Sequence, residues 1–308
     1  WIPILMKASP APTCKRDIPF WTIPGTDRQL LCDIWRPSDG KVSGLAFIYF
    51  HGSGWHIGDK DFGTRLFFSH LAAQGHTIMD VSYRLFPEVD MYGMIGDVKR
   101  AVAWMKENAS RYGVNPEKIV LGGGSAGGHL AILAAYTPED PVLTAEDLIN
   151  ADLSVRGVIS YYGPTDLFAF YRHTGQHRVK QQRDGYYPPL STDPDAPKDL
   201  RNAGRLDKIF GGHPEEVPEK YALFSINAYV HAGCPPTLLI QGEHDRSVPV
   251  EATSAYFAQL VEAGVPAVNV VFPWTDHGFD LLLPLVNPAF QSALFDVDRF
   301  LAFLQKED

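Results

Sequence analysis

Short apolar runs alternate along the chain with longer segments in which apolar residues recur every three or four positions. Apolar runs bounded by polar or turn residues predict strands, and an unbroken run is typical of a strand buried on both faces of a sheet. The strands predicted in this way are Leu45–Phe50, His76–Tyr83, Lys118–Leu121, Val155–Tyr161, Pro236–Gln241 and Val268–Phe272.

Two segments, 98–109 and 290–304, repeat apolar residues on one helical face. Strands that alternate with helices predict a mostly parallel sheet covered by helices on both faces, which is an α/β fold. Asp17–Ile23 and Gln29–Trp35 flank a turn and predict a pair of edge strands. Because 308 residues with 45% apolar composition can bury one large core, we expect a single domain over residues 1–308.

The pattern breaks between about residues 167 and 229, where aromatic residues, prolines and mixed charges follow no sustained period. A long irregular insertion in a compact domain is usually functional or disordered, and this one is richer in aromatic residues than a disordered linker. We interpret it as a cap over the active site, with a decorative surface insertion as the alternative. Its Phe168, Phe170 and Tyr171 are candidates for lining the substrate pocket, together with Trp55.

Residues Gly123–Gly127 spell G-x-S-x-G between a predicted strand and a strong helix former, residues 129–135. A serine on so tight a strand-to-helix turn adopts a strained backbone and exposes its Oγ above the sheet edge. Glycines flank it because a Cβ there would clash with the neighbouring strand or helix. The helix N-terminus supplies N–H groups for a developing oxyanion. We therefore predict Ser125 as a nucleophile.

A second glycine-rich segment, His51–Trp55, directly follows the unbroken apolar run Leu45–Phe50. A loop of this kind lets backbone N–H groups approach a substrate oxygen closely, as the oxyanion-hole loop of a serine hydrolase does. A simple turn between strand and helix is the alternative. The presence of Ser125 downstream favours the oxyanion loop.

A serine nucleophile needs a base and a residue that orients it, in the chain order Ser, Asp or Glu, His. Asp245 follows the predicted strand Pro236–Gln241, and His277 follows the predicted strand Val268–Phe272. Both lie at strand carboxyl ends, the side on which open α/β sheets bind ligands. Glu243 is the alternative acid, but it sits closer to the strand, so we favour Asp245.

Three other polar residues near these motifs have simpler interpretations. Asp276 precedes His277 and is expected to be a loop or capping residue. His129 shares a helical face with Ser125 and is expected to be packed and hydrogen-bonded. Asp166 follows a predicted strand and is expected to cap the next turn, with a catalytic role as the alternative.

Taken together, the motifs resemble those of α/β-hydrolase-fold serine esterases of the HGGG type, the hormone-sensitive-lipase-like group. The chain also shares traits with the branch that contains feruloyl esterases and kynurenine formamidases. The resemblance implies Ser125 as nucleophile, His277 as base and Asp245 as its orienting acid. It also implies an oxyanion hole formed by N–H groups, those of Ser53, Gly54 and Ala126. The matching segments are His51–Trp55, Tyr83–Glu88, Gly123–His129, Asp245–Pro249 and Asp276–Phe279.

Three departures from that group affect the expected substrate. Ser53 replaces the third residue of HGGG, but its backbone N–H remains usable. Gly124 stands where hormone-sensitive-lipase relatives usually have Asp. The D-x-x-V-P pattern of residues 245–249 is closer to the feruloyl-esterase and prolyl-oligopeptidase branches. The departures leave the implied mechanism intact and leave the substrate class open.

We therefore expect a serine carboxylic-ester hydrolase that acts on short-chain esters through an acyl-enzyme. Short esters are favoured because nothing in the sequence supplies the broad apolar surface of an interfacial lipase. The alternatives are hydrolysis of formamides, amides or peptides by the same triad, and a non-catalytic binding module on the same fold. The presence of His277 argues against the binding module.

The net charge limits the expected binding partners, and the cysteine pattern bears on disulfides and metals. A net charge of −9 makes nucleic acid and anionic membranes poor partners, so the expected partner is a small-molecule ester. Three cysteines do not make a disulfide framework, and around the turn near Gly25 Cys32 would face about Pro19 rather than Cys14. No CxxC or HExxH spacing occurs, so we expect neither a metal nor a cofactor. The oligomeric state stays open, with a homodimer as one option.

The amino end bears on the compartment. The chain begins at Trp1, which is consistent with an upstream anchor or signal segment that has been removed. Trp1–Lys7 is too short to span a bilayer. The compartment therefore stays open.

Overall fold

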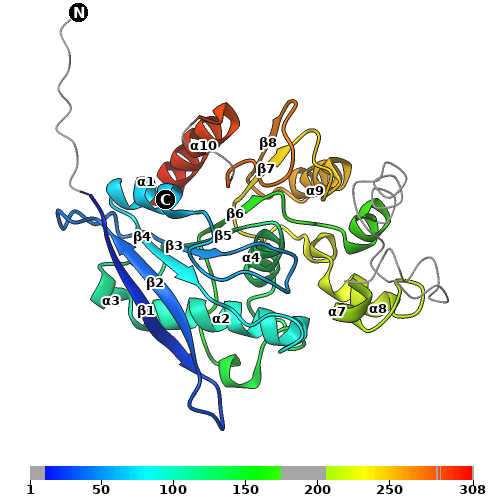
Figure 1. Ribbon diagram of the computed structural model, residues 1–308, viewed down its shortest axis with the longest axis horizontal. Helices are drawn as coiled ribbons and strands as arrows, with labels where there is room; N and C mark the ends of the chain where they lie inside the picture. Colours follow the sequence, from blue (N-terminus) through cyan, green and yellow to red (C-terminus); the bar gives the residue numbers. More distant parts are fainter. Residues whose placement is uncertain (1–10, 175–205, 282–283, 285, 307–308) are drawn as a thin grey trace, which may run out of the picture.

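The structure is a computed structural model that describes residues 11–174, 206–281, 284 and 286–306 (Figure 1). Trp1–Lys7 and residues 175–205 of the predicted cap lie outside the described residues. The described chain forms an eight-stranded sheet in the order β1-β2-β4-β3-β5-β6-β7-β8. Its strands are Thr13–Thr22, Gln29–Arg36, Ala46–Phe50, Thr77–Val81, Ile119–Gly124, Gly157–Tyr161, Thr237–Gly242 and Ala267–Phe272, numbered β1 to β8 in chain order.

The neighbouring strands β4, β3, β5, β6, β7 and β8 pair in parallel. Strands β1 and β2 form an antiparallel hairpin, and β2 also pairs antiparallel with β4. Every residue of β3, β4, β5, β6 and β7 is buried, whereas β8 at the sheet edge is only half-buried. This is the burial that unbroken apolar runs predict for central parallel strands. The predicted α/β fold, with its mostly parallel sheet and its edge hairpin, is therefore confirmed.

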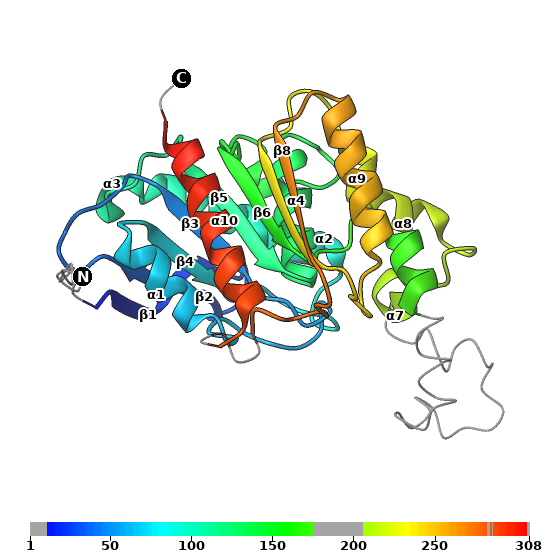
Figure 2. The same cartoon turned by 90° about the horizontal axis from the view of Figure 1, so that it is seen from above.

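Helices cover both faces of the sheet (Figure 2). α1 and α10 pack on one face around Phe68 and Leu301, and α2, α4 and α9 pack on the other around Val98, Leu130 and Leu260. α4 is buried along its whole length. The helices labelled in Figure 1 are α1 Arg65–Ala73, α2 Met91–Glu107, α3 Ala109–Tyr112, α4 Ala126–Tyr136, α7 Leu206–Phe210, α8 Pro218–Phe224, α9 Val250–Glu262 and α10 Pro288–Gln305. Short 3₁₀ turns lie at Glu146–Leu148 (η1) and Ile226–Tyr229 (η2).

The register of the edge hairpin differs by one residue from the sequence-based expectation. Cys32 pairs with Ile18, not Pro19, and Cys14 pairs with Trp35. The reason is an irregularity between Pro19 and Trp21, where the pairing slips by one residue. A second slip follows between Lys15 and Ile18, where Asp17 has φ 54°. All three cysteines are free, as the sequence indicates.

The predicted cap region contains helical segments in its described parts. Residues 167–174 are helical, and α7, α8 and η2 follow after the undescribed stretch. Figure 1 places α7 and α8 on the opposite side of the molecule from the β1–β2 hairpin. Whether residues 167–229 act as a cap, and whether the chain is one domain, stay predictions. Within the described parts of the chain, no helix has the length and apolar character needed to cross a bilayer.

Candidate active site

Ser125 lies on the sharp turn between β5 and α4. It has φ 53° and ψ −119°, a strained conformation for a residue with a side chain. Its backbone N–H donates to the carbonyl oxygen of Tyr161 at 2.8 Å, and its own carbonyl accepts from the N–H of His129 at 3.0 Å. The turn is thus tied to β6 on one side and to the first turn of α4 on the other.

The glycines around Ser125 are required by close approach of neighbouring backbone. A Cβ on Gly127 would lie 1.9 Å from the carbonyl oxygen of Phe50, and a Cβ on Gly123 would lie 2.4 Å from the Gly127 carbonyl carbon. Real Cβ contacts never come this close, so larger residues here would push β3 and α4 apart. The sequence-based explanation of the G-x-S-x-G glycines therefore matches the packing.

Three side chains predicted to act together meet at the carboxyl ends of the parallel strands. His277 Nε2 lies 3.0 Å from Ser125 Oγ, and His277 Nδ1 lies 2.9 Å from Asp245 Oδ2. The Asp245 side chain is fully buried, whereas the His277 side chain keeps 21% of its surface exposed. A nucleophile, a base and an orienting carboxylate within hydrogen-bond reach are the arrangement needed for acyl transfer.

The Asp245 carboxylate is held from several directions. Oδ1 accepts from the backbone N–H groups of Ser247 and Val248, both at 2.8 Å. Oδ2 accepts from Gln241 Nε2 at 3.3 Å and faces His277. Glu243, the alternative acid, instead has a half-exposed side chain that accepts from the Trp274 N–H. The structure therefore brings Asp245, and not Glu243, to the imidazole.

The three polar residues given simpler interpretations have the contacts expected of them. His129 is fully buried, and its Nε2 donates to the Phe224 carbonyl at 2.7 Å. Burial lowers the pKa of His129 to about 4, so the ring stays neutral. Asp166 Oδ1 accepts from the N–H groups of Phe168 and Ala169 and caps the helical segment that follows. Asp276 pairs with Arg246 and accepts from the His277 N–H.

The glycine-rich loop after β3 lies directly against the turn that carries Ser125. A Cβ on Gly52 would lie 2.9 Å from the Gly124 carbonyl oxygen and 3.3 Å from Ser125 Cβ. Ser53 has φ 81° and Gly54 has φ 65°, so Ser53 adopts a conformation that favours glycine. Within the described residues, no protein acceptor is bound by the N–H groups of Ser53, Gly54 or Ala126. These groups are available for a substrate oxygen.

The loop of residues 82–90 packs against the His51–Trp55 loop. The Tyr83 hydroxyl donates to the His51 carbonyl at 2.9 Å, and the two rings stack with centroids 4.6 Å apart. The Phe86 N–H donates to the Trp55 carbonyl at 2.9 Å. Both ends of the His51–Trp55 segment are thereby fixed by one neighbouring loop.

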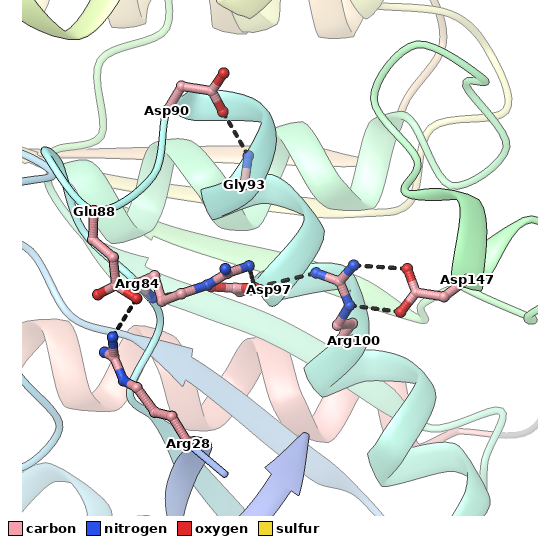
Figure 3. Close-up of polar contacts among 8 residues, drawn as sticks. All are labelled: Arg28, Arg84, Glu88, Asp90, Gly93, Asp97, Arg100 and Asp147. Atoms are coloured by element: carbon pink, nitrogen blue, oxygen red, sulfur yellow. Dashed lines mark hydrogen bonds and ion pairs between the residues drawn. The ribbon is translucent and has the colours of Figure 1, made fainter. Parts of the chain in front are cut away.

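That neighbouring loop is anchored to α2 by an ion-pair network (Figure 3). Arg84 forms a bidentate ion pair with the fully buried Asp97: its Nε lies 2.8 Å from Oδ2, and its Nη2 lies 2.7 Å from Oδ1. Arg100 extends the network from Asp97 to Asp147, and its guanidinium lies 3.8 Å from the centre of the Trp21 ring. Buried two-pronged pairs fix geometry more than they add stability. The Tyr83–Glu88 motif thus fixes the position of the His51–Trp55 loop.

The four predicted pocket residues differ in their surroundings. Trp55 is 1% exposed, and its ring lies edge-on to His129 and to Phe170. Phe168 packs on Tyr221 of α8, and the Tyr171 hydroxyl lies 3.0 Å from the His213 ring. Phe168, Phe170 and Tyr171 are half-buried. Contact with a substrate stays a prediction for all four.

Sequence reasoning missed three residues of the site. Gln241 donates to Asp245 and also to the Val248 carbonyl at 2.9 Å. Tyr162 lies over His277, with ring centroids 4.3 Å apart, and donates to the buried Asp280. A signal was present for Asp280, because it is a lone carboxylate within the apolar run that follows His277. No group of histidine, cysteine and carboxylate side chains suited to a metal occurs among the described residues.

Comparison with known proteins places the chain in a family. A model of the BD-FAE family matches residues 32–260. The probable carboxylic ester hydrolase LipM of Mycobacterium tuberculosis is 32% identical, over 81% of this chain and 53% of that protein. Esterase LipQ of the same organism is 31% identical, over 86% of this chain and 57% of that protein. The chain thus spans about half the length of the curated relatives it matches.

Solved structures show the same fold. The butyrate-bound esterase 2 of Thermogutta terrifontis has a TM-score of 0.72 and 24% sequence identity, and the match covers 96% of this chain and 95% of that one. The same esterase phosphonylated by sarin has a TM-score of 0.73 and 24% identity, over 99% and 98% of the two chains. The chain therefore belongs to the BD-FAE family, and the resemblance to α/β-hydrolase serine esterases that its motifs indicate is confirmed.

Proposed function

We propose that the protein is a serine carboxylic-ester hydrolase that acts on short-chain esters. The observation that carries the proposal is the continuous chain of contacts from Ser125 Oγ through His277 to Asp245, at 3.0 and 2.9 Å. A buried carboxylate, a half-buried imidazole and a strained serine on a helix N-terminus meet in few settings other than acyl transfer. The names of the relatives LipM and LipQ support the same class.

In the proposed reaction, His277 Nε2 takes the proton from Ser125 Oγ as Oγ attacks the ester carbonyl carbon. Asp245 keeps the Nδ1 proton in place and stabilises the imidazolium that forms. The N–H groups of Ser53, Gly54 and Ala126 bind the oxyanion, and His277 then returns the proton to the leaving alcohol. Water repeats the sequence in the second half and releases the acid.

Organophosphate labelling tests the nucleophile, as the sarin adduct of the Thermogutta esterase suggests. Because the phosphorus centre is attacked by the activated serine, paraoxon should add one diethylphosphoryl group to the peptide that contains Ser125. Peptide mass spectrometry measures the site, and the His277→Ala variant is the control that should not be labelled at the same rate. Labelling at another serine would contradict the assignment.

A substrate panel tests the reaction class on the same preparation. We expect the highest kcat/KM with p-nitrophenyl acetate or butyrate and a decline with longer acyl chains, since nothing in the sequence supplies the broad apolar surface of an interfacial lipase. Aryl formamides and prolyl amides are included because the same triad can cleave them. Faster turnover of either amide class than of short esters would overturn the ester assignment.

The oxyanion loop gives a separate prediction. Ser53→Gly should keep kcat/KM within about tenfold of the wild type, because the N–H survives and the left-handed backbone suits glycine. Gly54→Pro should lower kcat by about 10²–10³-fold, because proline removes an oxyanion donor and cannot adopt the positive φ. Steady-state kinetics with p-nitrophenyl butyrate measures both effects, and circular dichroism checks the fold.

Two outcomes would contradict this account of the loop. A fall in kcat of about 10²–10³-fold in Ser53→Gly would mean that the Ser53 hydroxyl is itself an oxyanion donor. A mild effect in a folded Gly54→Pro variant would mean that the His51–Trp55 segment is only a turn.

A further inference from the structure

A second buried carboxyl group lies beside the proposed catalytic histidine. Asp280 follows His277 by three residues and is 8% exposed. The Tyr162 hydroxyl donates to Asp280 Oδ1, and the Tyr162 ring lies against the His277 ring with centroids 4.3 Å apart. One tyrosine therefore contacts both the imidazole and the carboxyl group. Neither residue belongs to the Ser125–His277–Asp245 arrangement.

Tyr162 is fixed in a costly conformation. Its φ is 42°, in the region that residues with side chains rarely adopt, and its side chain is buried. Its N–H donates to the Ile240 carbonyl of β7 at 2.7 Å, and the preceding carbonyl, that of Tyr161, accepts from Ser125. Strain of this kind persists where surrounding structure enforces it, and it gathers at functional sites. The same short segment thus positions the nucleophile backbone and the ring against His277.

Gly124 leaves room for this arrangement. A Cβ at Gly124 would lie 3.3 Å from the Tyr162 hydroxyl and 3.3 Å from the Tyr49 hydroxyl, closer than most Cβ contacts. A side chain on the residue before Ser125 would therefore face the hydroxyls of Tyr162 and Tyr49. A side chain there would press on Tyr162, so the glycine belongs to the same arrangement.

The pKa values of Tyr162 and Asp280 make Tyr162 the donor of the hydrogen bond between them. Burial, followed by the nearby Asp280, raises the pKa of Tyr162 well above its ordinary value, so the hydroxyl keeps its proton and donates. Burial raises the pKa of Asp280 to about 6, although Tyr162 and His277 act in the opposite direction. Above that pH the carboxyl group is an anion with Tyr162 as its donor. The other titratable groups that interact with it are Tyr49 and Tyr161.

We propose that Asp280 and Tyr162 are positioning residues for His277. The pair acts on the imidazole in addition to Asp245. Tyr162 fixes the tilt of the ring toward Ser125, and the Asp280 anion favours the imidazolium that forms when His277 accepts the serine proton. The proposal rests on the proposed function, because it assigns His277 the role of the base. Asp245 and Asp276 also contact His277.

Kinetics of Asp280→Asn and Tyr162→Phe tests the proposal. Each variant keeps the size of the side chain and removes the charge or the hydroxyl. We expect kcat to fall about tenfold in Asp280→Asn, with KM within about twofold of the wild type, because the lost interaction develops with the imidazolium. The acid limb of the kcat/KM profile should move to lower pH by about half a pH unit or more. The double variant should lose less than the product of the two single effects.

The matched control is Asp298→Asn, which makes the same chemical change at a partly buried carboxylate on α10. Asp298 pairs with His70 at 2.9 Å and has no contact with His277. Its removal should leave the acid limb in place.

Thermal unfolding distinguishes a positioning role from a merely structural one. The pKa of Asp280 is raised in the folded state, so its ionisation lowers the free energy of unfolding as pH rises through about 6. Asp280→Asn should therefore not lower Tm at pH 8, although it lowers kcat.

A readout without turnover keeps the test independent of the proposed function. In a Ser125→Ala background, NMR of ¹³C-labelled histidine follows the protonation of His277 directly. The midpoint should fall by about half a pH unit or more when Asp280→Asn is added. An unchanged midpoint together with an unchanged acid limb would overturn the positioning role, even if Ser125→Ala abolishes activity. Full ester hydrolysis by Ser125→Ala would instead overturn the proposed function.

Discussion

Ser125→Ala should lower kcat/KM for p-nitrophenyl butyrate by about 10⁵–10⁶-fold, the loss typical of removing a triad nucleophile. The reason is that Oγ is the atom 3.0 Å from His277 Nε2, and alanine leaves the base with no proton to take. Residual turnover above the buffer rate would come from the oxyanion donors and from substrate binding. Initial rates at several enzyme concentrations measure the loss.

The same variant should fold normally. Ser125 already has φ 53°, and alanine has the same Cβ and the same strain at that position. We expect an unchanged circular dichroism spectrum and a Tm close to that of the wild type. Ser125→Gly would relieve the strained φ and is a useful companion, since it should be equally inactive and no less stable. A rate near that of the wild type in either variant would place the nucleophile elsewhere.

Much of the fold follows from two periodicities that sequence alone displays. The unbroken apolar runs become the buried strands β3 to β7, and the helical face of residues 98–109 packs against the sheet through Val98, Val102 and Met105. The hairpin register could not be predicted to the residue, because the pairing slips between Pro19 and Trp21 and again between Lys15 and Ile18. At the second slip the Asp17 N–H donates to Asp33 Oδ1, a contact that alternation of apolar residues does not encode.

The site divides in the same way between local and distant information. Ser125 and the 51–55 loop were predictable because strand-to-helix turns require particular residues within a few positions. The pairing of Tyr162 with Asp280 was not, since 118 residues separate the two partners of this hydrogen bond. Gln241 was missed for a related reason. It ends an apolar strand as an ordinary polar residue, and only the position of Asp245 gives it a partner.

The contacts that fix the His51–Trp55 loop could be predicted only in part. The Tyr83–Glu88 segment was singled out only through its resemblance to a family motif, and the sequence assigned it no task. In the structure Tyr83 donates to the His51 carbonyl, and Arg84 ties the segment to Asp97 on α2. The pairing of two loops 32 residues apart needs the parallel sheet, which brings the ends of β3 and β4 together.

Asp245→Asn should lower kcat by about 10⁴-fold, the second of the two largest effects we expect. Asp245 Oδ2 accepts from His277 Nδ1 at 2.9 Å, and an asparagine amide offers that nitrogen an N–H donor as readily as an oxygen. The imidazole would then favour the tautomer with a proton on Nε2, which cannot accept the Ser125 proton. Oδ1 also accepts from Ser247 and Val248, so the carboxamide oxygen is expected to keep those bonds and turn its NH₂ toward His277.

Glu243→Gln is the matched control, because it makes the same chemical change two residues away. The Glu243 side chain is 53% exposed and contacts His244 and the Trp274 N–H rather than His277, so kcat should stay within about threefold of the wild type. Steady-state kinetics at pH 8, with Tm for both variants, compares the two carboxylates directly. A large loss in Glu243→Gln and a small one in Asp245→Asn would transfer the orienting role to Glu243. Equal and small losses would mean that His277 is oriented without a carboxylate, which the buried, four-fold hydrogen-bonded Asp245 argues against.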